Sequence, residues 1–171
     1  MKALLYCALI LSMAATSAFA QAAPGSDPIK GMWKLNPDKS KNPVPVPDTE
    51  IITIVGQESA YKLTFDMKYR DSKTSFEVVT DMKGGTVKSV NADGQGKPDS
   101  WRVTRQGLNA FDMEVKTSFG GRTDKYEVSL DGKTMMLHRV PTDKRMFVTY
   151  TDKAGAERRL SDYVLVFDRV E

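Results

Sequence analysis

The chain is poor in the residues that most often carry chemistry, since its 171 residues include one cysteine and one histidine. The cysteine, Cys7, lies in an apolar N-terminal run, which excludes a disulfide framework for the rest of the chain. The histidine, His138, has no second histidine or cysteine at a metal-ligand spacing. We therefore predict no metal site, no cofactor and no catalytic residue, and interpret His138 as an exposed or rim residue of a strand.

A dominant charge sign and long apolar runs are also missing after the N-terminus. Lys and Arg number 25 against 22 Asp and Glu, the net charge is +3, and the two signs are interleaved along the chain. This pattern gives no electrostatic case for nucleic acid. No later apolar run reaches the roughly 20 residues of a membrane-spanning helix, so we expect no stable membrane insertion. The sequence gives no indication of oligomeric state.

The first twenty residues have the three parts of a secretory signal peptide. Lys2 supplies the positive charge, residues 3–13 are the short apolar region, and Ala-Phe-Ala precedes the expected cleavage point after Ala20. We expect the mature protein in the periplasm or outside the cell. Cleavage leaves about 150 residues, enough for one domain, which we divide into a flexible leader at 21–30 and a single β-barrel domain at 31–171.

Alternation of apolar and polar residues dominates the chain after residue 48. Every second residue from Tyr61 to Tyr69 is apolar, and the residues between them are charged or Thr, which is typical of a strand with one buried face. Similar alternation occurs at 111–115, 126–130, 146–150 and 160–170. Asp-Gly and Gly-Gly pairs lie between these segments, as tight hairpins require. We predict an all-β antiparallel meander that closes into a lipocalin-like barrel, with a β-sandwich as the alternative.

One segment imitates a calcium-binding loop. Residues 91–96 place oxygen-bearing side chains at alternate positions and a glycine sixth, but the twelfth position is Arg102 where a bidentate glutamate is needed. We interpret the segment as a hairpin turn, so no metal ligand is predicted there either.

The start of the predicted barrel resembles a known family. Residues 31–36 read G-M-W-K-L-N, and a D-G-K-T hairpin follows at 131–134; together they resemble lipocalins and lipocalin-like small exported bacterial β-domains, whose first strand begins G-x-W. The resemblance implies that Gly31 and Trp33 close the barrel base and that Trp33 packs against an arginine near the chain end. Arg169 is the best-placed arginine, with Arg158 and Arg159 as alternatives. The resemblance also implies a central cavity for a small hydrophobic molecule.

The inward face of such a barrel follows from the alternation. Nine methionines are present, several of them in register with the apolar faces, and thioethers make an adaptable lining for a ligand or an ordinary core filling. The residues that we expect on the interior face are Phe65, Met67, Phe111, Met113, Val128, Met146 and Tyr150.

Three functions are compatible with this sequence. The first is an exported lipocalin-like protein, not an enzyme, that binds a small hydrophobic ligand in the barrel interior. The second is an envelope or secreted interaction module with a filled core, which uses exposed aromatics such as Tyr69, Trp101 and Phe119. The third is a barrel enzyme such as an isomerase or cyclase; it ranks last because the alternation places few polar groups inside.

Overall fold

The computed structural model describes residues 27–41, 47–88, 90–91, 100–117, 120–142, 148–151, 157–160 and 163–171. Within these ranges the secondary structure consists of strands joined by turns, so the all-β prediction is confirmed. The strands are β1 (Gly31–Leu35), β2 (Thr49–Gln57), β3 (Ala60–Tyr69), β4 (Ser72–Thr80), β5 (Lys83–Lys88), β6 (Val90–Asn91), β7 (Ser100–Arg105), β8 (Ala110–Thr117), β9 (Gly120–Val128), β10 (Thr134–Pro141), β11 (Val148–Thr151), β12 (Glu157–Leu160) and β13 (Tyr163–Val170).

Eleven strands form one sheet in the order β5-β7-β8-β9-β10-β13-β1-β2-β3-β4-β6. Most neighbours are consecutive in the chain and antiparallel, as in a meander. Short turns join them: Glu58 between β2 and β3 and Arg70 between β3 and β4 both take positive φ, at 41° and 50°, which matches the right-handed strand twist. The last strand, β13, pairs with both β10 and β1 and so brings the chain end against its beginning.

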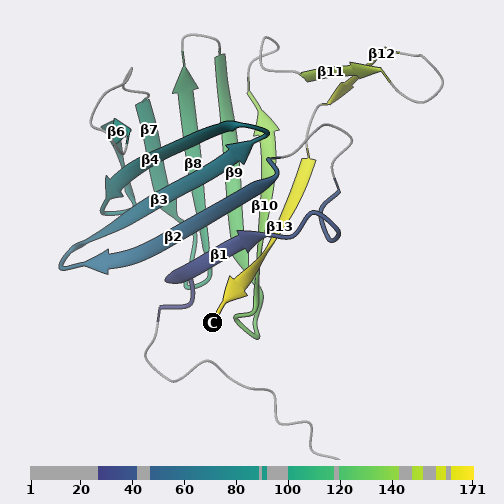
Figure 1. Ribbon diagram of the computed structural model, residues 1–171. Coiled ribbons are helices and arrows are strands. Elements are labelled where there is room, and N and C mark those ends of the chain that lie inside the picture. The colour runs from purple at the N-terminus through teal and green to yellow at the C-terminus, as the bar shows by residue number, and fades with distance from the viewer. Residues whose placement is uncertain are drawn as a thin grey trace, which may run out of the picture.

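The two ends of this sheet meet, so the predicted barrel is nearly closed. β5 pairs with β7, while β6, which follows it in the chain, pairs with β4. β4 leads directly into β5 through Asp81 and Met82, and the Arg105 amide of β7 donates to the Met82 carbonyl at 2.8 Å. Figure 1 shows the two walls, with β1–β4 crossing in front of β7–β10.

Strands β11 and β12 form a separate two-stranded sheet. In Figure 1 this hairpin stands away from the barrel wall, above β10 and β13. The predicted strand at 146–150 therefore contributes its described backbone to the hairpin and not to the wall.

The alternation predicted from sequence places apolar side chains inside. On β8, for example, Phe111, Met113 and Val115 are buried while Glu114 and Lys116 are exposed. One expectation is wrong: Leu130 is 98% exposed, because the strand pattern stops before it. The residues from Ser129 onward form the β9–β10 turn, in which Gly132 donates its amide to the Ser129 carbonyl.

One end of the barrel, which we call the base, is closed by residues just before β1. Trp33 is fully buried there, and its Nε1 donates to the Ile29 carbonyl at 3.0 Å. Ile29 is itself fully buried, and Asp27 accepts hydrogen bonds from Tyr61 at 2.6 Å and Arg105 at 2.7 Å. The packed domain thus extends back to Asp27, four residues before the expected start, because these side chains complete the core.

Arg169 fastens this base from the other end of the chain. It is the backbone partner of Trp33 in the β1–β13 ladder, and its guanidinium lies 4.2 Å from the centre of the Trp33 ring. It donates to the carbonyls of Pro28, Lys30 and Gly132 at 2.7, 2.8 and 2.5 Å. Trp33 and Arg169, which lie near opposite ends of the described chain, are thus in contact at the base.

Candidate functional site

The opposite end of the barrel, which we call the rim, is where β8 ends and β9 begins. Its inner wall carries four charged side chains, Glu50 on β2, Arg122 and Asp124 on β9, and Arg139 on β10. We call these four residues the acid–base cluster. They share the inward parity of apolar neighbours: Glu50 lies two residues before Ile52, and Asp124 two before Tyr126.

Asp124 is the centre of the acid–base cluster. Its side chain is fully buried and accepts hydrogen bonds from Arg139 Nε at 2.6 Å, Arg139 Nη2 at 2.8 Å and Arg122 Nε at 3.1 Å. Burial alone raises the pKa of Asp124, but the charges and hydrogen bonds of Arg139 and Arg122 outweigh it and hold the pKa below its usual value. Asp124 is therefore ionised, and two guanidinium groups share one carboxylate.

Glu50 differs from Asp124 although both are buried. It is 3% exposed, and the structure gives its carboxyl no hydrogen bond within the part of the chain it describes. Burial raises the pKa of Glu50; the Arg139 charge opposes this change and the Asp124 charge adds to it. The Glu50 carboxyl therefore ionises less readily than the Asp124 carboxyl, which two guanidinium groups hold in its charged form.

Apolar side chains lie directly beside the acid–base cluster. Met67 is the cross-strand partner of Glu50, and Met113 is the partner of Asp124. Phe65, Phe76 and Trp101 form a stack, with ring centres 4.8 Å apart for Phe65–Phe76 and 5.2 Å for Phe76–Trp101. The rim end of the interior therefore combines charged groups with flexible and aromatic surfaces.

The predicted interior residues fall into three groups. Phe65, Met67 and Met113 lie near the acid–base cluster, Met67 half-buried and the other two buried. Deeper in the barrel, Phe111 stacks on Tyr126 at 4.6 Å and Val128 packs towards the base. Met146 lies outside the described residues. Tyr150 has its backbone on β11, away from the wall, and its side chain lies outside the description.

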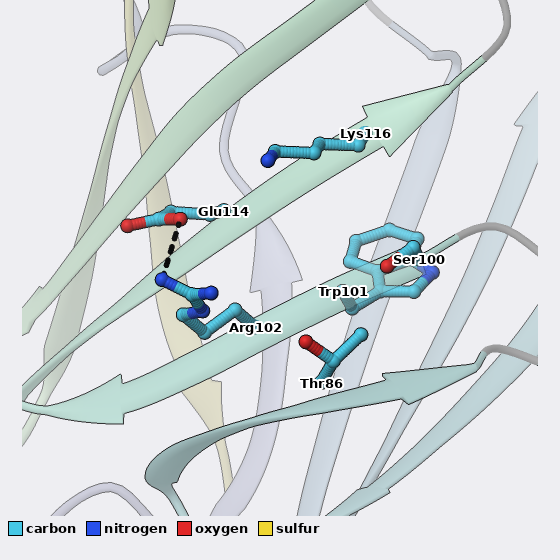
Figure 2. A pocket seen from close by; sticks show the side chains of 6 residues that line it. All are labelled: Thr86, Ser100, Trp101, Arg102, Glu114 and Lys116. Atoms are coloured by element: carbon cyan, nitrogen blue, oxygen red, sulfur yellow. Dashed lines mark ion pairs between the residues drawn. The ribbon is translucent and has the colours of Figure 1, made fainter.

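A shallow pocket also occurs on the outer face of the barrel. Figure 2 shows its lining on β5, β7 and β8, including an ion pair of 3.7 Å between Arg102 and Glu114. Its volume is about 40 Å³, room for only one or two water molecules. Both charged side chains are half exposed, so we place the candidate site in the interior and not here.

Two expectations about side chains are wrong at this end. Trp101, expected among exposed aromatics, is 4% exposed because it shares the inward parity of Val103. The acid–base cluster was missed because only apolar residues were taken to face inward. Arg122 and Asp124 lie on the same face of β9 as Tyr126 and Val128, because every second residue of a strand faces the same way. The sequence therefore did indicate that both charged residues face inward. Tyr69 is 46% exposed, whereas Phe119 lies outside the described residues.

Other predicted features are placed as follows. His138 is half-buried on the outward parity of β10, opposite Lys125 and Val164. Among the described residues no group of three metal-ligating side chains comes together. The same part of the chain contains no helix with the length and apolar character needed to cross a membrane. The side chains of Arg158 and Arg159 lie outside the description.

Comparison with known proteins adds no family assignment to this geometry. The chain matches no protein-family model. No curated protein sequence matches it either. What the structure establishes is a nearly closed antiparallel β-barrel with an arginine-fastened base and a buried acid–base cluster near its rim.

Proposed function

We propose that this chain is an exported, lipocalin-like β-barrel that binds a small, largely apolar molecule in the rim end of its interior. Ligand sites are mostly apolar surfaces with a few placed polar groups. The observation that carries the proposal is the contrast between the two ends: the base is filled by Trp33 and Ile29, whereas the rim end lines its wall with Met67, Met113 and the acid–base cluster.

Export is part of this proposal and rests on the signal-peptide pattern of residues 1–20, which lie outside the described residues. We expect N-terminal sequencing of protein recovered from the periplasm or the medium to begin at Gln21. Recovery of an uncleaved chain from the cytoplasm would contradict export without bearing on ligand binding.

The ligand proposal is tested with protein purified from its own compartment. A solvent extract analysed by mass spectrometry is expected to contain a bound small molecule, and the neutral dye Nile red is expected to bind and be displaced by it. Met67→Trp fills the inner wall and should weaken dye binding. Met136→Trp, at an exposed methionine on the outer face of β10, is the matched control. An empty extract together with no dye binding would refute the proposal and favour an interaction module with a filled core.

A second candidate function is favoured by Glu50 itself. A buried carboxyl with a raised pKa is a common general acid or base in active sites, so a barrel enzyme that moves a proton on an apolar substrate, such as an isomerase, also fits. The two candidates differ in the variant Glu50→Gln, which abolishes turnover in the enzyme. If the extracted molecule returns chemically unchanged after incubation with the wild-type protein, the enzyme candidate is refuted.

A further inference from the structure

Two leucines near the base are the most exposed large apolar side chains in the described part of the chain. Leu130 is 98% exposed and Leu108 is 82% exposed, whereas the next value is 50%, at Val79. Both lie in hairpin turns, Leu108 in 106–109 between β7 and β8 and Leu130 in 129–133 between β9 and β10. We call these two segments the leucine turns.

The leucine turns are neighbours at the base. The Val128 amide, at the end of β9, donates to the Asn109 carbonyl at 2.8 Å, and Asn109 Nδ2 donates back to the Val128 carbonyl at 2.8 Å. Leu108 is one residue away from this contact along the chain, and Leu130 is two residues away. Single apolar residues are common on protein surfaces, whereas exposed apolar groups that lie together mark a contact surface.

Hydrogen bonds fix the backbone of both leucine turns. Arg105 donates to the carbonyls of Gly107 and Leu108. In the other turn, the Ser129 hydroxyl donates to the Asp131 carboxylate at 2.6 Å. The leucine side chains therefore cannot fold back onto the barrel wall unless these bonds break, and their exposure is a fixed property of the two turns.

The chain enters the barrel beside the leucine turns. Arg105, which binds one turn, also donates to Asp27 at 2.7 Å, and Asp27 is the first residue that the structure describes. Arg169 donates to the Gly132 carbonyl of the other turn at 2.5 Å and to the Pro28 carbonyl at 2.7 Å. In Figure 1 this is the end of the barrel at which the C-terminus is marked. Each turn is thus linked by one arginine to the entering segment.

This entry point indicates what the leucine turns face. Residues 1–20 have the pattern of a signal peptide, and the apolar part of a signal peptide is held in the membrane until cleavage. Residues 21–26 link it to Asp27, and six residues reach at most about 20 Å. During export the base, and with it the two leucine turns, therefore lies close to the membrane surface from which the chain emerges.

The charges of the leucine turns suit a contact with lipid. The turn 106–109 contains no ionisable side chain, and the turn 129–133 contains one of each sign, Asp131 and Lys133. The neighbouring Arg105 is paired with a carboxylate, that of Asp27. The turns therefore present apolar groups without net charge, and their contact with a bilayer does not require anionic lipid.

We propose that the leucine turns dock the base of the barrel onto the surface of a lipid bilayer, with Leu108 and Leu130 inserted among the acyl chains. The docking rests on the export part of the proposed function and is independent of a ligand in the interior. Two leucine side chains bury less apolar area than one acyl anchor, so the docking is weak and reversible.

The test uses the full chain, so that residues 1–20 hold it at a membrane. The chain is synthesised with phosphatidylcholine vesicles in a cell-free extract that lacks signal peptidase. Leu130→Trp places a fluorescent reporter in a leucine turn, and Met136→Trp places the same reporter on the outer wall of β10, where Met136 is 44% exposed. Trp33 and Trp101 are 0% and 4% exposed and give a constant background.

Docking predicts that the emission added by Leu130→Trp shifts to shorter wavelength and is quenched by brominated phosphatidylcholine. The emission added by Met136→Trp should not be quenched. Equal behaviour of the two reporters in the vesicle-bound chain would overturn the docking and leave export intact. A full chain that does not float with the vesicles would contradict both the docking and the membrane role of residues 1–20.

A second substitution separates apolar docking from other contacts. Leu108→Ser in the Leu130→Trp chain should lower the docking equilibrium constant about tenfold, because one buried leucine side chain is lost. Met136→Ser in the same chain is the control and should leave the quenching unchanged. Leu108 is exposed, so the melting temperature should not change either. Equal quenching in both variants would overturn the role of Leu108.

Two further outcomes would assign the leucine turns to another contact. Quenching that requires phosphatidylglycerol and disappears in high salt would overturn an apolar docking, because it would indicate attraction to basic side chains. An unquenched reporter, together with a vesicle-free protein that sediments as a dimer in the wild type and as a monomer in Leu130→Ser, would overturn the lipid contact in favour of a second copy of the chain.

Discussion

Replacing Asp124 by asparagine removes the one negative charge that two arginines share. Asn keeps the size of the side chain and one acceptor oxygen, but the three charge-assisted hydrogen bonds from Arg139 and Arg122 become weaker. Breaking a buried ion pair from one side costs about 3–5 kcal/mol. Because one acceptor remains, we expect a cost at the lower end of this range: the free energy of unfolding should fall by about 3 kcal/mol and the melting temperature by roughly 6–12 °C.

The assay is urea unfolding at pH 7 with the wild type and two further variants. Asp112→Asn is the control: Asp112 lies on the next strand, faces outward and accepts a hydrogen bond from Gln106 Nε2 at 3.0 Å, so loss of its charge should change stability by about 0.5 kcal/mol or less. The double variant of Asp124→Asn with Arg139→Gln should cost clearly less than the sum of the two single changes. Additive costs, with a coupling below about 0.5 kcal/mol, would refute the view that Asp124 and Arg139 act as one buried pair.

The sign of the pH effect provides a second check on Asp124. Its pKa is lower in the folded state than the unfolded value of about 3.9. The stabilisation is therefore complete above about pH 4 and is lost as the pH falls through the folded-state pKa. The difference in stability between wild type and Asp124→Asn should shrink in acid; a constant difference down to pH 2 would contradict an ionised Asp124.

Three further predictions concern the cluster and the base. Glu50 has a raised pKa in the folded state, so wild-type stability should fall as the pH rises above about 4.3, and Glu50→Gln should become the more stable protein by urea midpoints at pH 7. Gly31→Ala should cost roughly 1–3 kcal/mol by thermal unfolding, because Gly31 has a φ of 137° and a Cβ would lie 2.6 Å from Arg169 Nη1. Arg169→Lys should destabilise by about 2 kcal/mol or more in urea, since an ammonium group cannot span three carbonyls and cover Trp33.

Each of these predictions has a control in the same chain. Gly85→Ala should be neutral or slightly stabilising because a Cβ there meets nothing within 4 Å. Arg102→Lys and Glu114→Gln alter an exposed pair and should leave stability within about 0.5 kcal/mol. Equal losses in Gly31→Ala and Gly85→Ala, or in Arg169→Lys and Arg102→Lys, would contradict the role given to the base. A Glu50→Gln urea midpoint that follows the wild type at every pH would contradict a raised pKa for the buried Glu50 carboxyl.

The fold could be predicted because period-two alternation and turn residues are local signals. The inward positions of Phe65, Phe111 and Met113 follow from this alternation. The inward position predicted for Leu130 was wrong because the alternation does not show where β9 ends. The acid–base cluster needed more than local pattern. Its members come from β2, β9 and β10, and only the register of the closed barrel shows that Asp124 and Arg139 are partners.

The end of the chain posed a different problem. Residues 146–150 and 160–170 alternate in the same way, yet β11 pairs with β12 while β13 completes the barrel. Alternation shows that a segment is a strand but does not show which strand it pairs with. Buried polar residues such as Glu50 could not be predicted for the same reason. The free-energy cost of burying them depends on neighbours that are distant in sequence.

The barrel closes where β5 pairs with β7 and β6 pairs with β4, and this closure determines where the sheet can open locally. Among the described residues β3 and β4 share nine register pairs, whereas β4 and β6 share two, Phe76–Asn91 and Glu77–Val90. Amide hydrogens on the outer edge of β4 should exchange with solvent much sooner than those of β8 and β9, which have paired strands on both sides over most of their length. Phe76 of β4 belongs to the aromatic stack with Trp101. Opening of the β4–β6 ladder, the shortest between described strands of the sheet, would therefore expose the interior beside the acid–base cluster to solvent.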